Sequence, residues 1–153
     1  MNKAYWSSRY KKQQTGWDIG EASGPLIHLF QKIENKNLKI LIPGCGHAYE
    51  ANYLSHKGFL NIFIMDIALE PLNEFRLQNK TFPEQHILHE DFFRHQGQYD
   101  LIVEQTFFCA ISPELRQNYV EKCFELLKDG GRLMGVLFDR EFEGGPPFGG
   151  NKN

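Results

Sequence analysis

Two glycines follow directly on a short apolar run, in the order Pro43-Gly44-Cys45-Gly46. Glycine lets the backbone approach a ligand closely, and the stretch after the loop predicts a helix whose first N–H groups face the same space. Such a loop can hold a nucleoside-containing cofactor, and it is also the ordinary tight turn between a strand and a helix. Gly44 and Gly46 are therefore candidate cofactor-binding residues, with both interpretations open on this motif alone.

An acidic residue, Asp66, ends the second apolar run, twenty residues after Gly46. A carboxylate at this place can accept both hydroxyls of a ribose, and it can equally cap the following helix. The loop and the acid together favour a cofactor that contains a nucleoside. Tyr49 occupies the position of the third glycine in dinucleotide-binding loops, so S-adenosylmethionine fits the pattern better than a pyrophosphate cofactor.

Polar and aromatic residues also follow the third and fourth apolar runs. Asp91 could receive an adenine amine and Phe92 could cover the ring, although Phe92 and Phe93 could equally be core residues. After the fourth run, the string from Glu104 to Cys109 (EQTFFC) brings polar groups and two aromatic rings to the centre of the predicted cleft. These strings extend the candidate site across four strand ends.

Histidine and cysteine do not suggest any further chemistry. His86 and His89 lie three apart in a predicted strand, so their side chains point to opposite faces and cannot converge on a metal. The three cysteines, at positions 45, 109 and 123, include no CxxC pair. We therefore expect no metal site, no disulfide framework and a reduced, cytoplasmic chain.

The hydrophobic pattern predicts the scaffold that must position these residues. Uniformly apolar runs alternate with segments of helical spacing, which is typical of a parallel sheet covered on both faces. Right-handed crossovers make such a sheet doubly wound, with ligands at the carboxyl ends of its strands. We expect strands at 38–42, 61–66, 86–89, 100–104 and 133–138, helices at 26–33, 47–56, 71–79 and 113–128, and a turn at 129–131.

Composition limits the possible functions. The chain has 153 residues, 41% of them hydrophobic, and this suits a single domain with its own core. A net charge of −2 argues against a nucleic-acid partner. The longest apolar runs are too short to cross a membrane, so a small molecule is the expected partner.

Several strings occur together in a characteristic order: Tyr5-Trp6, then TGWD at 15–18, IPGCG at 42–46, EQTFFCAI at 104–111 and GGPPF at 144–148. In this combination the chain resembles the thiopurine S-methyltransferase family over nearly its whole length. Within the family it is most similar to the halide and thiol methyltransferases of the branch called "harmless to ozone layer". The resemblance implies a Rossmann-like, class I S-adenosylmethionine-dependent methyltransferase, with S-adenosylhomocysteine as the other product.

The resemblance also implies roles for individual residues. An aromatic segment at 1–22 would cover the cofactor, and a lid and tail at 144–153 would carry Phe148. Gln105, Phe107 and Phe148 would lie at the reacting groups, although relatives carry Tyr or Arg in place of Gln105. The residues implied to hold the cofactor are Trp6, Tyr10 (usually Trp in the family), Trp17, Gly44, Gly46, Asp66, Asp91, Phe92 and Gln105.

The implied reaction is in-line displacement of the sulfonium methyl group by a soft nucleophile: a thiol, hydrosulfide, halide, thiocyanate or thiopurine. Such nucleophiles need little or no proton removal, so we expect alignment and water exclusion to dominate, without a dedicated general base. Two alternatives remain open. One is a nicotinamide-dependent oxidoreductase on the same sheet, and the other is an inactive relative that only binds the cofactor.

The end of the chain gives a separate expectation. The family resemblance implies further residues after GGPPF. Only fifteen residues follow Phe138, and 144–153 is too rich in Gly and Pro to supply the two strands that usually complete this fold. The fifth strand should therefore be an exposed edge able to support self-association. The lid bearing Phe148 should be mobile, because nothing after it anchors the tail.

Overall fold

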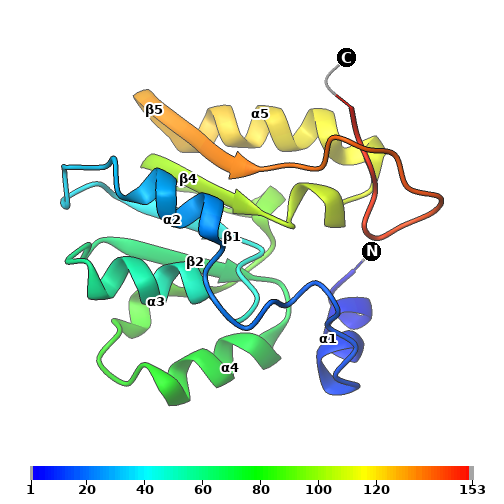
Figure 1. The fold of residues 1–153 in the computed structure, drawn as a ribbon, viewed down its shortest axis with the longest axis horizontal. Coiled ribbons are helices and arrows are strands. Elements are labelled where there is room, and N and C mark those ends of the chain that lie inside the picture. Colours follow the sequence, from blue (N-terminus) through cyan, green and yellow to red (C-terminus); the bar gives the residue numbers. More distant parts are fainter. Residues whose placement is uncertain (1, 152–153) are drawn as a thin grey trace.

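Apolar runs form the five strands of one sheet in the computed structural model, which describes residues 2–151. All neighbouring strands are parallel, in the order β3-β2-β1-β4-β5 (Figure 1). This confirms the predicted doubly wound α/β architecture. The strands are β1 (Ile40–Pro43), β2 (Ile62–Asp66), β3 (Ile87–His89), β4 (Tyr99–Gln105) and β5 (Leu127–Val136).

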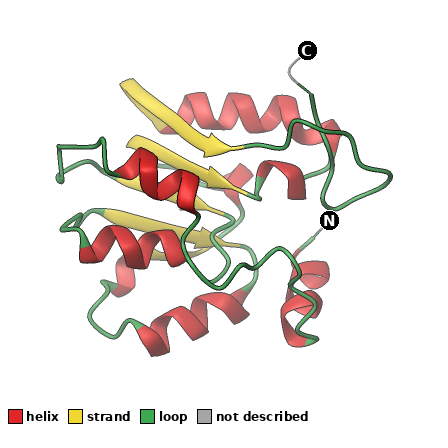
Figure 2. Ribbon diagram, viewed as in Figure 1, coloured by secondary structure: helices red, strands yellow, loops and turns green. Residues whose placement is uncertain are grey.

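Helices cover both faces of the sheet (Figure 2). Helices α2 (Gly24–Phe30), α3 (Tyr49–His56) and α4 (Leu69–Gln78) pack on one face, and α5 (Arg116–Leu126) packs on the other. Short 3₁₀ turns join them at Glu84–His86, Phe92–Arg94, Phe108–Ala110 and Pro113–Leu115. No helix within residues 2–151 combines the length and apolarity needed to cross a membrane.

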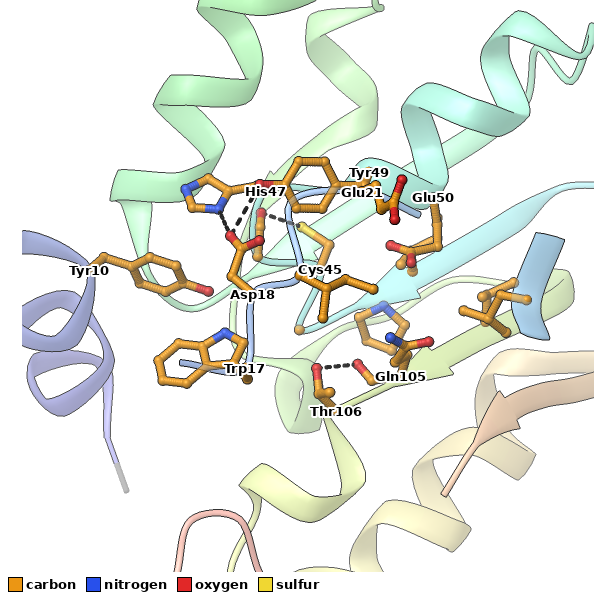
Figure 3. Close-up of a pocket in the computed structure, with 17 residues that line it drawn as sticks. Tyr10, Trp17, Asp18, Glu21, Cys45, His47, Tyr49, Glu50, Gln105 and Thr106 are labelled. Carbon is orange, nitrogen blue, oxygen red and sulfur yellow. Dashed lines mark hydrogen bonds and ion pairs between the residues drawn. The ribbon is translucent and has the colours of Figure 1, made fainter. Parts of the chain in front are cut away.

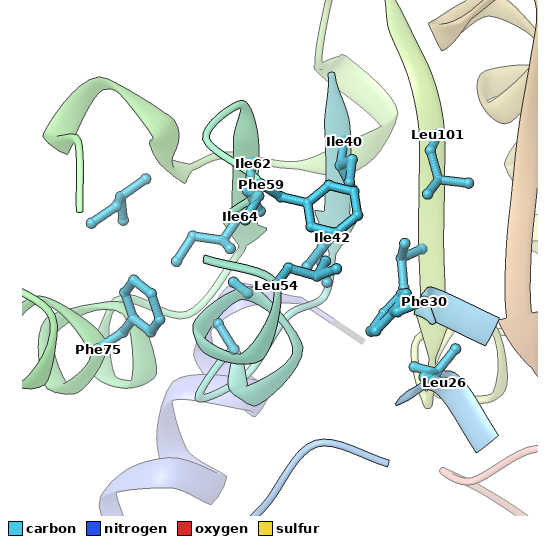
Figure 4. Close-up of a cluster of buried hydrophobic side chains, with 14 of the residues drawn as sticks. Leu26, Phe30, Ile40, Ile42, Leu54, Phe59, Ile62, Ile64, Phe75 and Leu101 are labelled. Atoms are coloured by element: carbon cyan, nitrogen blue, oxygen red, sulfur yellow. The ribbon is translucent and has the colours of Figure 1, made fainter. Parts of the chain in front are cut away.

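The core follows the alternation of side chains along each strand. Ile40 and Ile42 point to the face covered by α2, α3 and α4, where they meet Phe30 and Leu54 (Figure 4). Leu41, between them, points to the opposite face under α5. Both faces of β1 are therefore buried, which explains why its sequence is apolar throughout.

A helix that the sequence pattern did not indicate, α1 (Lys3–Lys11), lies beyond the carboxyl ends of the strands (Figure 1). None of its side chains is fully buried, so it has no apolar stripe to detect. Ring contacts of Trp6 and Tyr10 with Trp17, together with polar contacts to α4, hold it in place. Ser7 donates a hydrogen bond of 2.7 Å to Glu70 of α4, and Lys11 lies 3.3 Å from the same carboxylate.

The predicted boundary between the last helix and the last strand was wrong. Helix α5 ends at Leu126, and β5 begins at once, so Asp129-Gly130-Gly131 lies inside the strand rather than in a turn before it. Tyr99 pairs with Leu127 and Leu101 pairs with Arg132, which places residues 128–131 in an irregularity of the ladder. Gly130 has φ +75°, a conformation that glycine adopts without strain.

Strand β5 ends at Val136 and forms one edge of the sheet, and no further strand pair follows it up to residue 151. The expectation that nothing anchors the tail was wrong. The N–H of Phe148 donates a hydrogen bond of 2.7 Å to the carbonyl of Cys109, and Arg116 donates one of 2.6 Å to the carbonyl of Gly149. The tail is therefore held at the start of α5 and at Cys109, and residues 152–153 lie outside the described part.

Candidate active site

A solvent-open cleft with about 580 Å³ of empty space lies at the carboxyl ends of β1 and β4 (Figure 3). The walls come from the segment after α1, the glycine loop after β1, the start of α3 and the end of β4. The doubly wound sheet thus brings together segments that are far apart in the sequence.

The floor of the cleft is the glycine loop. Gly44 and Gly46 have φ values of +57° and +53°, in the left-handed region that favours glycine. A Cβ atom on Gly44 would collide with the ring of Phe107, and one on Gly46 would lie 3.1 Å from the hydroxyl of Tyr10. Both positions therefore favour glycine for conformation and for space, and the neighbours that need the space are side chains of the chain itself. The predicted approach of a ligand to Gly44 and Gly46 stays a prediction.

Asp66 holds this loop from the end of β2. Its carboxylate accepts hydrogen bonds from the N–H of Gly46 at 2.9 Å and of Ala68 at 2.8 Å, and the residue is 6% exposed. Burial raises the pKa of Asp66, and the backbone hydrogen bonds offset part of that effect. These bonds are those of a cap on the glycine loop and on the segment after β2, and Asp66 is not among the residues that line the cleft. Its role as ribose acceptor stays a prediction.

An aromatic cluster covers one side of the cleft. Tyr10 and Trp17 line it, and their rings meet edge to face with centroids 5.9 Å apart. Trp6 packs edge to face on Trp17 at 5.6 Å, behind the lining, so it supports Trp17 rather than facing the cleft itself. Electron-rich ring faces are suitable neighbours for a sulfonium cation.

A group of polar contacts centred on Asp18, missed by the sequence analysis, holds the segment after α1 in place. Asp18 accepts hydrogen bonds from His47, from the hydroxyl of Tyr49 at 3.2 Å and from the N–H of Gly20 at 2.7 Å. Burial raises the pKa of Asp18, but these hydrogen bonds outweigh it, so the pKa lies below its ordinary value. The other ring nitrogen of His47 lies 2.9 Å from Glu74 of α4. Asp18 stands in the TGWD string, which was the only signal for it.

The charge of the cleft distinguishes between cofactor classes. Asp18, Glu21 and Glu50 line it, whereas no lysine or arginine is among the described lining residues. Glu50 accepts a hydrogen bond of 3.1 Å from the N–H of Ser23, and burial raises its pKa. An acidic cleft without a lysine or arginine in its described lining suits a sulfonium and an ammonium group and disfavours a pyrophosphate, so the lining fits S-adenosylmethionine.

The end of β4 forms the inner wall. Gln105 lines the cleft, and its buried side-chain oxygen has no hydrogen-bond partner. Thr106 has φ +62°, an unusual backbone conformation for a β-branched residue. Its hydroxyl donates a hydrogen bond of 2.6 Å to the carbonyl of Gln105. An unsatisfied buried amide beside a strained residue is typical of a site that receives a ligand.

Some candidate residues lie outside the cleft. Phe92 is 4% exposed and packs edge to face on Phe107 at 5.2 Å, in the core cluster under α5. Asp91 caps its own 3₁₀ turn by accepting a hydrogen bond of 3.0 Å from the N–H of Phe93. Phe148 lines a second cavity, which adjoins the cleft at Gln105 and Thr106. The proposed adenine contacts of Asp91 and Phe92 and the catalytic role of Phe107 stay predictions.

This fold matches solved methyltransferase structures. Magnesium protoporphyrin IX methyltransferase from Synechocystis PCC 6803, solved with bound SAH, aligns with a TM-score of 0.77 at 13% identity, over 98% of this chain and 82% of that one. The 1,6-didemethyltoxoflavin-N1-methyltransferase of Burkholderia thailandensis gives 0.73 at 16% identity, over 91% and 62%. The chain therefore has the class I methyltransferase fold.

The sequence defines the family. A model of the family "Thiopurine S-methyltransferase (TPMT)" matches residues 1–152, so the chain belongs to this family of S-adenosylmethionine-dependent methyltransferases. It is 30% identical to probable thiol methyltransferase 2 of Arabidopsis thaliana and 29% identical to thiocyanate methyltransferase 1 of the same plant, each over 94% of this chain. It spans 66% and 65% of their lengths. Family membership confirms the predicted cofactor, S-adenosylmethionine.

Proposed function

We propose that this chain transfers the methyl group of S-adenosylmethionine to a small soft nucleophile: a thiol, hydrosulfide, halide, thiocyanate or thiopurine. The observation that carries the proposal is the meeting of two cavities at Gln105 and Thr106. One is acidic and suits a cationic cofactor, and the other is mainly apolar and suits an acceptor. The names of the Arabidopsis relatives support thiols and thiocyanate as members of the acceptor class.

The residues of the acidic cleft are suited to holding the cofactor. Gly44 and Gly46 line the cleft and are the proposed neighbours of its methionine part. Asp66, which holds Gly46 from behind the lining, is the proposed ribose acceptor. Tyr10 and Trp17 present rings to the positive charge. When bound, S-adenosylmethionine supplies an electrophilic methyl group on a sulfonium.

The residues that would contact the acceptor act mainly by positioning it. Gln105 stands between the two cavities, so its side chain can orient an acceptor that enters from the side of Phe148. Alignment of two reactants and removal of water from a soft nucleophile are established sources of rate enhancement. Phe108 and Phe148 supply the apolar walls that exclude water.

Headspace gas chromatography tests the proposal after incubation of the chain with S-adenosylmethionine and either sulfide or iodide. Methanethiol from sulfide or iodomethane from iodide, in amounts exceeding the enzyme, is the expected result. Gln105→Ala should lower either yield, and Gln117→Ala, an exposed change on α5, is the matched control. Binding of S-adenosylhomocysteine without any volatile product would favour the inactive cofactor-binding relative, and binding of NADH would favour the oxidoreductase.

A further inference from the structure

The second cavity has about 590 Å³ of empty space, open to solvent, between the end of β4, the end of β5 and the C-terminal tail. Phe108, Phe138 and Phe148 give it a mainly apolar lining. It shares Gln105 and Thr106 with the acidic cleft, so a molecule in it lies beside the proposed cofactor site. No lysine, arginine or histidine is among the lining residues that the structure describes.

One charged group lines this cavity: Glu104, the penultimate residue of β4, which is 1% exposed. Its Oε1 accepts hydrogen bonds from the N–H groups of Phe107 at 2.8 Å and Phe108 at 2.7 Å. Its Oε2 is buried and has no hydrogen-bond partner. A buried carboxylate oxygen without a donor is costly to maintain, so it points to a proton or a ligand that the oxygen receives.

Arg116 of α5 packs on Phe108 and donates to the carbonyl of Gly149, but it is not among the groups that shift the pKa of Glu104. The titratable groups that interact with Glu104 electrostatically are Cys109, Cys123 and Tyr119, and each is neutral near pH 7 because burial raises its pKa. For the two thiols, the raised pKa is about 11. Burial likewise raises the pKa of Glu104 to about 7, although its two N–H donors oppose the shift. A carboxyl group poised near neutral pH is suited to exchanging a proton.

We infer that Glu104 accepts the proton of a neutral thiol bound in the second cavity. In this step the S–H bond breaks, an O–H bond forms at Oε2, and the electron pair stays on sulfur as a thiolate. The inference rests on the proposed function, for which that thiolate is the nucleophile. It supplies the general base that we did not expect from the sequence, and Glu104 returns the proton to water after the thioether leaves.

The same geometry selects among the acceptors. A halide or thiocyanate is already an anion, so it would enter an apolar cavity lined by a carboxylate. The guanidinium of Arg116 lies 4.7 Å from the centre of the Phe108 ring and donates to the carbonyl of Gly149, but Arg116 is not among the described lining residues. Both the loss of hydration and the repulsion from ionised Glu104 oppose binding of the anion. A neutral thiol or hydrogen sulfide enters without either penalty. Small thiols are therefore the substrate class that this cavity favours.

Opposite pH profiles test the inference. In the unmodified chain, kcat/KM for ethanethiol should rise with pH to a plateau near 7, while kcat/KM for iodide should fall over the same range. Glu104→Gln keeps an oxygen for the N–H groups of Phe107 and Phe108 but cannot take a proton. It should lower kcat/KM for ethanethiol at pH 7.5 by about 100-fold, a typical loss for a general base. Its iodide profile should become flat, without a loss at pH 7.5.

A binding measurement adds a readout that does not depend on turnover. Calorimetry of iodide binding to the chain loaded with S-adenosylhomocysteine, in two buffers of different ionisation enthalpy, gives the protons taken up. We expect uptake at pH 7.5 in the unmodified chain and none in Glu104→Gln, with Glu121→Gln on the exposed face of α5 behaving as the unmodified chain. The proton uptake of the unmodified chain is measured without any variant, so this test remains valid even if Glu104→Gln does not fold.

The outcomes separate the inference from the function on which it rests. If the unmodified chain methylates neither ethanethiol nor iodide, the proposed function fails. The inference is overturned if the chain is active but Glu104→Gln lowers kcat/KM for ethanethiol and for iodide equally. It is also overturned if iodide binds without proton uptake. In either case Glu104 only supports the turn at Phe107.

Discussion

The carboxylate of Asp66 accepts a hydrogen bond of 2.9 Å from the backbone N–H of Gly46, twenty residues earlier in the chain. This bond joins the end of β2 to the glycine loop after β1, the two features from which a nucleoside-containing cofactor was predicted. Gly46 in turn leaves the space that the hydroxyl of Tyr10 approaches. The loop, the strand end and the aromatic cover therefore form one connected unit.

Asp66→Ala should weaken the binding of S-adenosylhomocysteine about tenfold to a hundredfold. A hydrogen bond to a charged group contributes about 1.5–3 kcal/mol, and the variant loses both the proposed ribose acceptor and the support of the loop. Isothermal calorimetry measures the affinity, with the exposed Asp129→Ala as control. An unchanged affinity in Asp66→Ala would remove the residue from the cofactor site.

Gly44→Ala should destabilise the fold by about 1–3 kcal/mol or more, for two reasons. Alanine is strained at the left-handed backbone conformation of this position, and its Cβ would collide with the ring of Phe107. Gly58→Ala is the matched control, since Gly58 has φ +88° and open space where a Cβ would stand. It should cost about 1 kcal/mol from backbone strain alone. Urea unfolding provides both values.

A double variant isolates the collision in that prediction. Removing the ring in Gly44→Ala/Phe107→Ala should make the effect of the glycine substitution similar to that of Gly58→Ala, giving a clear interaction energy between positions 44 and 107. If the two substitutions are additive, the contact between Gly44 and Phe107 does not determine the residue at 44.

The stability of the chain should fall as pH rises through Glu104's titration range. Burial raises the pKa of Glu104 from 4.5 to about 7, so the folded state binds a proton that the unfolded state has already released. Its contribution is fully present below pH 4.5 and is lost as pH rises through 7, by up to about 3 kcal/mol. Glu104→Gln should therefore gain stability relative to the unmodified chain between pH 5 and pH 8. Thermal unfolding at matched pH values checks this, and parallel curves for the two proteins would contradict it.

We propose that the chain self-associates through β5. This strand is an edge of the sheet, and Leu133, Leu137 and Phe138 on and after it are 46%, 59% and 44% exposed. Sedimentation velocity should show concentration-dependent association that Leu133→Glu abolishes. Phe124→Glu is the control, since Phe124 is also exposed but lies on α5. A monomer at all concentrations would contradict the proposal.

The sheet could be predicted from the sequence because a strand that is buried on both faces has consecutive apolar residues. Ile40, Leu41 and Ile42 are consecutive apolar residues that pack on alternate faces of the sheet, a pattern typical of a central parallel strand. The glycine loop could also be predicted, since Gly44 and Gly46 adopt backbone conformations with positive φ that favour glycine. Both features depend on local chemistry that a single sequence displays.

Other parts depend on contacts between distant residues, which leave no local pattern. Helix α1 has no buried residue and is held by Ser7 and Lys11 on Glu70 and by Trp6 and Tyr10 on Trp17. The anchoring of the tail by Arg116 on Gly149 likewise joins positions 33 residues apart. Glu104 could be seen in its string, but its burial and its unpaired oxygen appear only once β5 and the tail pack against it.

Calorimetric titration of the 153-residue chain with S-adenosylhomocysteine and, separately, with NADH tests the central claim most directly. The acidic cleft under Tyr10 and Trp17 predicts one saturable site for S-adenosylhomocysteine, and the lack of a described lysine or arginine in its lining predicts no binding of the pyrophosphate cofactor. Saturable binding of NADH, or no heat from S-adenosylhomocysteine at a concentration where the chain is folded, would contradict the account.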